Sequence, residues 1–257
     1  MGIQTRATSA AHNGEACRRS LIRVLGTLAG AQAVRPEALH KLRVDLRRLQ
    51  AWFLLNGDPR SAEILGRRIS LLSPLRSLQV LEGWLARRRA PRSDLRKVRL
   101  ASRELAAQLA GDKVFTTIRH SVEGLRGLDR RPDAARLRKV WRLHLDRCKS
   151  LLSRLRKNPK RKRLHALRLE LKQLRYQLEW LAAETGRRER LIERLKQAQR
   201  CLGDYEDLAA FRKLAEQFDL RSRPMILKRW KRARKAARAL PGDLRWLPVS
   251  LRRLGRA

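Results

Sequence analysis

The sequence predicts an all-α protein made of two related halves. Leucine, arginine and alanine dominate its 257 residues, leucines recur at helical spacing, and no stretch alternates like a strand between turn signals. An internal repeat favours two halves, because the segment HKLRVDLRRL at 40–49 returns as HALRLELKQL at 165–174. The two copies share a pattern of histidine, leucines and cations, and we refer to each copy as a histidine motif.

Each histidine motif is amphipathic when it is placed on a helix. At about 100° per residue, the cationic side chains gather on one side and the leucines on the other. The first copy sets His40, Arg43 and Arg47 against Leu42, Leu46 and Leu49, and the second sets His165, Arg168, Lys172 and Arg175 against Leu167, Leu171 and Leu174. A cationic stripe backed by leucines is suited to holding a polyanion on a rigid scaffold.

Turn and cap signals divide the first half, residues 15–128, into helices. A flexible N-terminal tail is expected at 1–14, which lack periodicity. Pro36 begins the helix of the first histidine motif, the breaker cluster at 56–59 ends it, and Pro74 predicts a later bend. The expected helices run at about 21–29, 36–56, 62–72, 78–85 and 95–109.

The second half is expected at 129–240, because residues 111–132 are less regular and make the best boundary. The break at 158–160 precedes the second histidine motif, and Gly186 predicts the end of its helix. A short helix is expected near 225–230, followed by an irregular, basic C-terminal tail at 241–257.

Composition indicates a folded protein with a very basic surface. The 63 Lys and Arg exceed the 24 Asp and Glu, giving a formal net charge of +39 that repels itself unless a polyanion neutralises it. Disorder is disfavoured because 43% of the residues are hydrophobic and periodic. The three cysteines, Cys17, Cys148 and Cys201, form no Cys-x-x-Cys pair and predict neither a disulfide framework nor a zinc site. Without a signal-peptide core or a run of about 20 apolar residues, we expect a cytoplasmic protein that does not enter membranes.

With both motifs in view, the sequence resembles the CHAD family, helical domains named for their recurring histidines. The second copy carries the most specific part, because Arg175, Tyr176 and Glu179 follow it in place. Further matching positions are Lys196, Gln199, Leu202, Gly203 and Asp207, and the resemblance covers roughly Ser20 to Leu240.

The resemblance implies two pseudo-symmetric four-helix bundles that face each other across a basic groove or channel. It further implies that this groove binds inorganic polyphosphate, often at intracellular polyphosphate granules. The polyphosphate-binding residues expected on this basis are His40, Arg43, Arg47, Arg48, Arg76, His165, Arg168, Lys172, Arg175, Tyr176 and Lys196, with Asp207 as an acid that orients arginines.

One departure from the family pattern follows the first histidine motif. The family usually carries a Leu-Gly-x-x-Arg-Asp-x-Asp segment there, whereas Ser73, Pro74, Ser77 and Gln79 stand in those places and only Arg76 remains. The sequence therefore predicts no acid to orient the arginines of the first half.

The cationic stripes suit polyphosphate on chemical grounds. Polyphosphate is a flexible, featureless chain with about one negative charge per phosphate, so a receptor needs a track of charges. The planar guanidinium of arginine can bind two phosphate oxygens at once and stays charged when partly buried. His40 and His165 would donate more strongly once protonated, which predicts tighter binding as the pH falls.

Two other functions remain open from the sequence. A helical RNA- or DNA-binding protein would use the basic segment beyond Arg221, although aromatic residues are only 5% and no nucleic-acid-reading motif occurs. A polyphosphate-processing enzyme would need carboxylates for Mg²⁺, and the cluster at 204–207 is the only tight acidic group. No phosphate-binding glycine loop or nucleophile–base pair is evident, so we expect a non-enzymatic protein without a cofactor or metal, and the sequence leaves its oligomeric state open.

Overall fold

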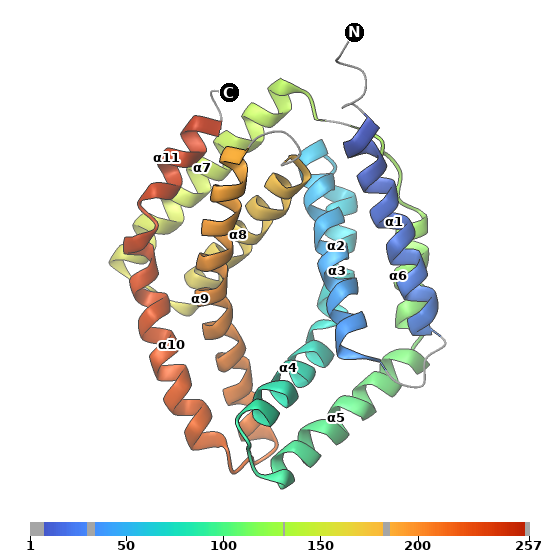
Figure 1. Cartoon of the computed structure of the whole chain (residues 1–257), viewed down its shortest axis with the longest axis vertical. Coiled ribbons are helices and arrows are strands. Elements are labelled where there is room, and N and C mark those ends of the chain that lie inside the picture. The colour runs from blue at the N-terminus through green and yellow to red at the C-terminus, as the bar shows by residue number, and fades with distance from the viewer. Residues whose placement is uncertain (1–7, 30–33, 131, 182–185, 255–257) are drawn as a thin grey trace.

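The computed structural model describes residues 8–29, 34–130, 132–181 and 186–254, and in this part of the chain the regular secondary structure is all helical (Figure 1). The all-α prediction is confirmed for these residues. The helices are α1 (Thr8–Ala29), α2 (Pro36–Asn56), α3 (Pro59–Leu71), α4 (Ser73–Arg87), α5 (Arg92–Gly111), α6 (Val114–Glu123), α7 (Ala134–Lys157), α8 (Arg161–Leu181), α9 (Gly186–Gln217), α10 (Arg223–Asp243) and α11 (Trp246–Leu254).

The helix carrying the first histidine motif ends where the sequence predicts. Gly57 has φ 84° and closes α2 in the left-handed conformation, which a residue without Cβ adopts readily. The next helix begins at once, because the Asp58 side chain accepts a 2.9 Å hydrogen bond from the Ser61 N–H. This tight corner lays α3 back against α2.

Four local predictions are corrected by the structure. Residues 8–14 belong to α1, so the predicted tail is helical from Thr8, while residues 1–7 lie outside the described part of the chain. Gly186 begins α9 where the sequence predicted a stop, α6 lies in the stretch expected to be irregular, and α10 and α11 occupy most of the predicted C-terminal tail. The first expected helix, 21–29, lies within α1, and the residues that follow it, 30–33, are also outside the described part.

Several helix pairings before residue 129 have counterparts after it in the described part of the chain. α1 packs on α2 and α6 as α7 packs on α8 and α11, and α2 pairs with α3 as α8 pairs with α9. The halves differ at the Ser73-Pro74 bend, since α3 and α4 are separate helices whereas α9 runs unbroken. α4 pairs with α5 as α9 pairs with α10.

Three clusters of buried apolar side chains hold the helices together. One lies mainly among α1, α2, α3 and α6 and includes Leu75 of α4 and Ala106 and Leu109 of α5. A second lies among α7, α8, α9, α10 and α11 and includes Leu55 of α2. A third joins α4 and α5 of the first half to α9 and α10 of the second, with Trp84 and Phe211 at a ring distance of 5.7 Å. Residues before and after position 129 therefore fill mainly different cores, with Leu55 as the exception, while the third core draws on both halves.

The helices are arranged as a ring around an open centre (Figure 1). The halves meet at α2 and α8 on one side, and at α4 and α5 with α9 and α10 on the opposite side. Within the described residues, no helix combines the length and the apolar character needed to cross a bilayer.

Candidate functional site

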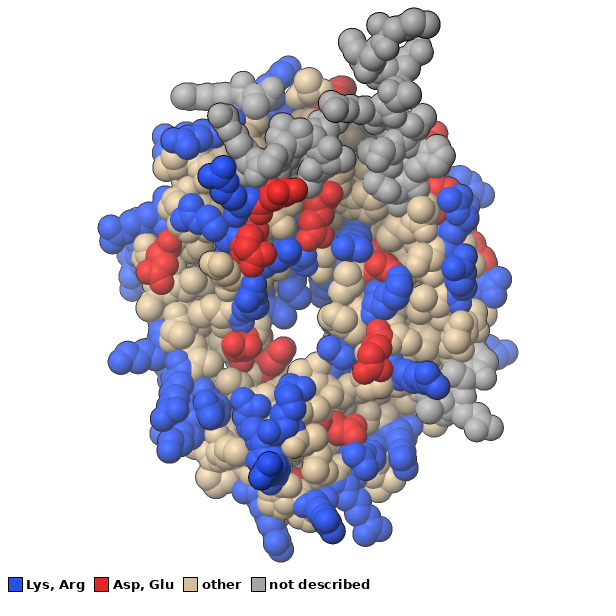
Figure 2. All heavy atoms as spheres, viewed as in Figure 1, with Lys and Arg blue, Asp and Glu red and all other residues tan. Residues whose placement is uncertain are grey.

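Both histidine motifs face a central cavity of about 720 Å³ between α2, α3, α4, α8 and α9. Figure 2 shows the opening at the centre of the molecule, with both basic and acidic side chains around its rim. The leucine faces of α2 and α8 are buried in two separate cores, which leaves the cationic faces of both helices turned toward this shared space. The predicted site residues that line the cavity are His40, Arg43, Arg47, Arg76, His165, Arg168, Lys172, Tyr176 and Asp207.

Arg43 is fixed by α3 and α4 in place of the acid that the first half lacks. Its Nη1 donates to the Ile69 carbonyl oxygen at 2.9 Å and to Ser73 Oγ at 3.0 Å. Ser73 Oγ itself donates to the Ile69 carbonyl at 3.1 Å. Where the family usually has an acid, Ser73 thus orients the guanidinium of Arg43 without neutralising its charge.

Arginines from both motifs crowd around Lys172. Burial, followed by repulsion from Arg168 and Arg47, lowers the pKa of Lys172 to about 7. Burial and the neighbouring arginines also lower the pKa of Arg43 to about 10, which leaves it charged at neutral pH. The Nε of Arg168 is buried and has no hydrogen-bond partner among the residues that the structure describes. The unliganded cavity therefore holds a surplus of positive charge and an unused donor.

Two acids of α9 border the cavity and differ in their environments. Glu206 lies 3.2 Å from Arg161 and 3.3 Å from His165 Nδ1. Burial alone would raise its pKa, but the hydrogen bonds from His165 and Arg161 outweigh burial and lower it. Asp207 is exposed to the cavity. Desolvation by the surrounding protein raises its pKa, although the positive charges of Arg168 and Lys172 act in the opposite direction. Glu206 thus holds two cations in place, while Asp207 is poised closer to protonation.

Arg161 is absent from the residues that the sequence predicted to bind the ligand, whereas Glu206 belongs to the acidic cluster at 204–207 that was expected to hold neighbouring arginines in place. Arg161 lies one turn before His165 on α8 and lines the cavity beside it. The i,i+4 spacing between these two residues could have revealed Arg161, because such residues share one helix face.

Comparison with known proteins bears on this arrangement. The family model of the CHAD domain matches residues 15–216, most of the chain. The chain belongs to the CHAD family. The resemblance on the histidine motifs is thereby confirmed, although α10 and α11 lie beyond the matched residues. No curated protein matches the chain.

A solved structure has a fold similar to that of this CHAD domain. The crystal structure of the CHAD domain from the plant Ricinus communis is 19% identical in sequence and superposes with a TM-score of 0.60. The similarity covers 98% of this chain and 91% of the plant chain. At this identity the likeness concerns the fold, and it includes the C-terminal helices.

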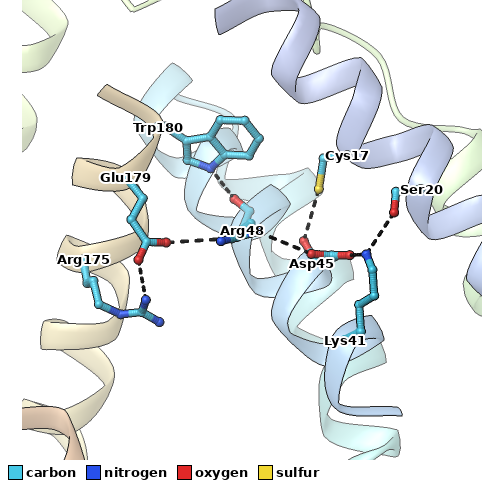
Figure 3. A network of polar contacts seen from close by, with 8 residues as sticks. All are labelled: Cys17, Ser20, Lys41, Asp45, Arg48, Arg175, Glu179 and Trp180. Carbon is cyan, nitrogen blue, oxygen red and sulfur yellow. Dashed lines mark hydrogen bonds and ion pairs between the residues drawn. The ribbon is translucent and has the colours of Figure 1, made fainter. Parts of the chain in front are cut away.

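Three predicted binding residues of this CHAD domain lie outside the central cavity. Arg48 and Arg175 are drawn to Glu179, as Figure 3 shows: Arg175 Nη1 donates to it, and Arg48 Nε lies 3.8 Å away. Lys196 is exposed on α9 and lies 3.5 Å from Glu193. Each of these cations is paired with an acid, unlike the arginines that crowd around Lys172.

A second, smaller cavity of about 300 Å³ lies beside this network, between α1, α2 and α8. Its charges are balanced, since Asp45 lies 2.6 Å from Lys41 and 3.7 Å from Arg48. Tyr176 borders both cavities. The smaller cavity therefore combines cations with their own counter-ions and differs from the cationic centre.

A buried polar cluster at His144 escaped the sequence analysis. His144 on α7 lies 2.5 Å from Glu170 and 2.6 Å from the Gln177 side-chain oxygen, both on α8. All three side chains are buried, so the cluster ties α7 to α8 behind the second histidine motif. The sequence pattern of α8 could not reveal this cluster, because the partner of Glu170 is His144, which lies on a different helix.

No group of three or more His, Cys, Asp or Glu that could hold a metal ion occurs in the described part of the chain. The cysteines Cys17, Cys148 and Cys201 are free thiols. Burial raises the pKa of Cys17 and of Cys148 to about 12, which keeps both thiols protonated.

Proposed function

We propose that this CHAD domain binds inorganic polyphosphate in the central cavity without cleaving it. On this proposal, the two halves act as related bundles that face each other across a basic channel. The observation that carries it is the convergence of both histidine motifs on one cavity, where the charges of Arg43 and Arg168 lie close enough to Lys172 to lower its pKa.

The surroundings of the cavity favour a polyphosphate over a nucleic acid. A stretch of phosphates presents only charge and oxygen acceptors, which the unpaired arginine donors match. Bases would require exposed aromatic platforms. The large apolar side chains exposed among the described residues are aliphatic, namely Leu71, Leu100, Leu143, Leu169 and Val249.

The chemistry around the cavity supports binding without catalysis. Glu206 is occupied with Arg161 and His165, so its carboxylate serves to hold cations. Asp207 stands among Arg168 and Lys172, whose charges would oppose the approach of a divalent cation. We expect the length of polyphosphate incubated with the protein and Mg²⁺ to stay unchanged on gels. Shortening that is abolished by Asp207→Ala would favour the enzyme instead.

Calorimetry with long-chain polyphosphate tests the binding proposal directly. The titration is run at about 0.15 M salt, where the Debye length is about 8 Å and diffuse attraction is screened. Excess tRNA and duplex DNA serve as competitors. We expect polyphosphate to stay bound, and displacement by nucleic acid would instead favour an RNA-binding function.

Matched charge reversals separate the cavity from the rest of the basic surface. We predict that Arg43→Glu with Arg168→Glu weakens binding by about 100-fold, because both arginines face the same stretch of ligand. The control is Arg232→Glu with Arg238→Glu, which removes the same charge from exposed positions of α10. A loss of less than about threefold is expected there. Equal losses in the two variants would indicate diffuse attraction.

The exposed face of α10 supports the alternative of nucleic-acid binding. It carries Lys228, Arg229, Lys231, Arg232, Lys235 and Arg238 at exposed positions. Trp230 beside them is partly buried, stacks on Tyr205 and is covered by Arg212, so its ring does not offer a free platform for bases. This face therefore offers attraction to any polyanion, and association with polyphosphate granules would draw on it as well.

A further inference from the structure

We propose that polyphosphate threads through this protein by a free end, because the wall around the central opening is closed on every side. The inference rests on the proposed function and adds a requirement about the ligand: a linear, unbranched polymer with at least one unblocked end. Three features of the ring support it, and they concern the two contacts between the halves and the size of the opening.

The first contact between the halves lies at α2 and α8. The rings of Trp52 and Trp180 are 5.0 Å apart, and Trp180 Nε1 donates to the Arg48 carbonyl oxygen at 2.9 Å. Figure 3 shows the hydrogen bond from Trp180 to Arg48 beside the Arg48–Glu179 pair, which also joins the two helices. Apolar packing, a hydrogen bond and an ion pair thus close this side of the ring.

The second contact lies on the opposite side, where α5 meets the start of α10. The buried carboxylate of Asp94 accepts hydrogen bonds from the N–H groups of Arg221 and Ser222 at 3.1 and 2.8 Å, and from Ser222 Oγ at 2.6 Å. Lys97 Nζ donates to the Phe218 carbonyl at 3.0 Å. The third apolar cluster lies directly beneath these bonds, so this side is closed by a core as well.

The opening passes through the molecule and is small. Figure 2 shows it unobstructed in the middle of the space-filling view. A cavity of about 720 Å³ is the size of a small-molecule pocket, so it holds only a short stretch of a long polymer. The remainder of a bound chain must leave by both mouths. A chain cannot reach that state sideways without breaking one of the two contacts between the halves.

Blocked polymers test threading with the wild-type protein. Linear polyphosphate is biotinylated at both terminal phosphates, and streptavidin is added either before the protein or after it. The complexes are then washed in about 1 M NaCl, which shortens the Debye length to about 3 Å and releases electrostatically held protein. Polymer with a single biotin is the matched control, since one free end remains.

We expect protein to survive the wash only where both stoppers were added after binding. That sample should retain at least about tenfold more protein than the sample blocked beforehand. Streptavidin at both ends keeps a threaded protein from sliding off the polymer, whereas salt still releases protein that is held only by electrostatic attraction. Single-biotin polymer should bind at about 0.15 M salt and release its protein in the wash. Equal retention whichever order streptavidin is added would overturn threading. Failure of the unblocked polymer to bind would overturn the proposed function instead.

Discussion

Lys172 makes the central cavity sensitive to protons. It is surrounded by Arg168 on its own helix, by Arg43 and Arg47 on α2 and by Asp207 on α9. With its pKa lowered to about 7, the free protein carries Lys172 as a mixture of ammonium and neutral amine at neutral pH. A polyanion in the cavity would raise this pKa, so binding and protonation should favour each other.

We predict that polyphosphate binding takes up protons and tightens as the pH falls through about 7. The sign follows because the complex holds Lys172 protonated, whereas the free protein loses that proton above its lowered pKa. At pH 7.5, about three quarters of a proton should be taken up by Lys172. Calorimetry in two buffers with different ionisation enthalpies measures this uptake.

Lys172→Arg should abolish most of the uptake while preserving binding, because an arginine remains charged throughout. Lys196→Arg is the control, since Lys196 is exposed and lies outside the cavity. Burial, Arg76, Arg43 and Lys172 lower the pKa of His40, so its own uptake should appear at lower pH. Uptake that is the same in wild type and Lys172→Arg would contradict the assignment.

At the residue scale, the sequence could predict the cavity residues because a helix face is a local property. The same spacing that opposes Leu42 to Arg43 holds in the folded protein. Helical spacing alone could not exclude Arg48 and Arg175 from the cavity. The acids that pair with them, Asp45 and Glu179, do lie within one helical turn of them in the sequence. The crowding that lowers the pKa of Lys172 depends on two distant segments and required the structure.

At the scale of elements, the junction between α5 and α10 depends on one carboxylate. Asp94 is 1% exposed and accepts hydrogen bonds from the N–H groups of Arg221 and Ser222, directly before α10. We predict that Asp94→Ala lowers the free energy of unfolding by about 2–4 kcal/mol, because buried N–H groups of the Arg221–Ser222 segment lose their acceptor. Urea denaturation followed by circular dichroism measures the change.

The control for this junction is Glu104→Ala, which removes the same charge from an exposed position of α5. A change within about 0.5 kcal/mol is expected there. If both variants lost the same stability, the general charge balance, not the junction, would account for the effect of Asp94→Ala.

Helices were predictable where helix-breaking residues and leucine spacing agreed, as at Gly57. Helices were missed where their stability depends on packing against other parts of the chain. α11 has only nine residues, too few to be stable alone, and Pro248 and two arginines made it resemble a tail. Its Leu247 and Leu251 are buried in the second core. α6 likewise buries Phe115 and Ile118 against α1 and its neighbours. Partners far along the chain stabilise these helices, so local patterns could not reveal them.

The whole molecule carries a formal net charge of +39, and the ring holds part of that charge in its centre. Mutual repulsion among these cations opposes the compact state. Two effects should therefore stabilise the protein: screening, which acts on every exposed charge, and occupation of the cavity, which acts through binding to the folded state.

We predict that these effects can be separated by thermal unfolding. Raising NaCl from about 0.05 to 0.5 M should raise the unfolding temperature by roughly 5 °C, since about 2 kcal/mol of relieved repulsion corresponds to such a shift in a chain of this size. Polyphosphate at constant salt should raise it further. In the Arg43→Glu, Arg168→Glu variant the salt effect should remain, whereas the polyphosphate effect should be lost. Loss of both the salt effect and the polyphosphate effect, or of neither, would mean that the cavity contributes no more than the rest of the basic surface. A specific site should lose its ligand effect when its own residues are changed, whereas an effect of net charge should not depend on those residues.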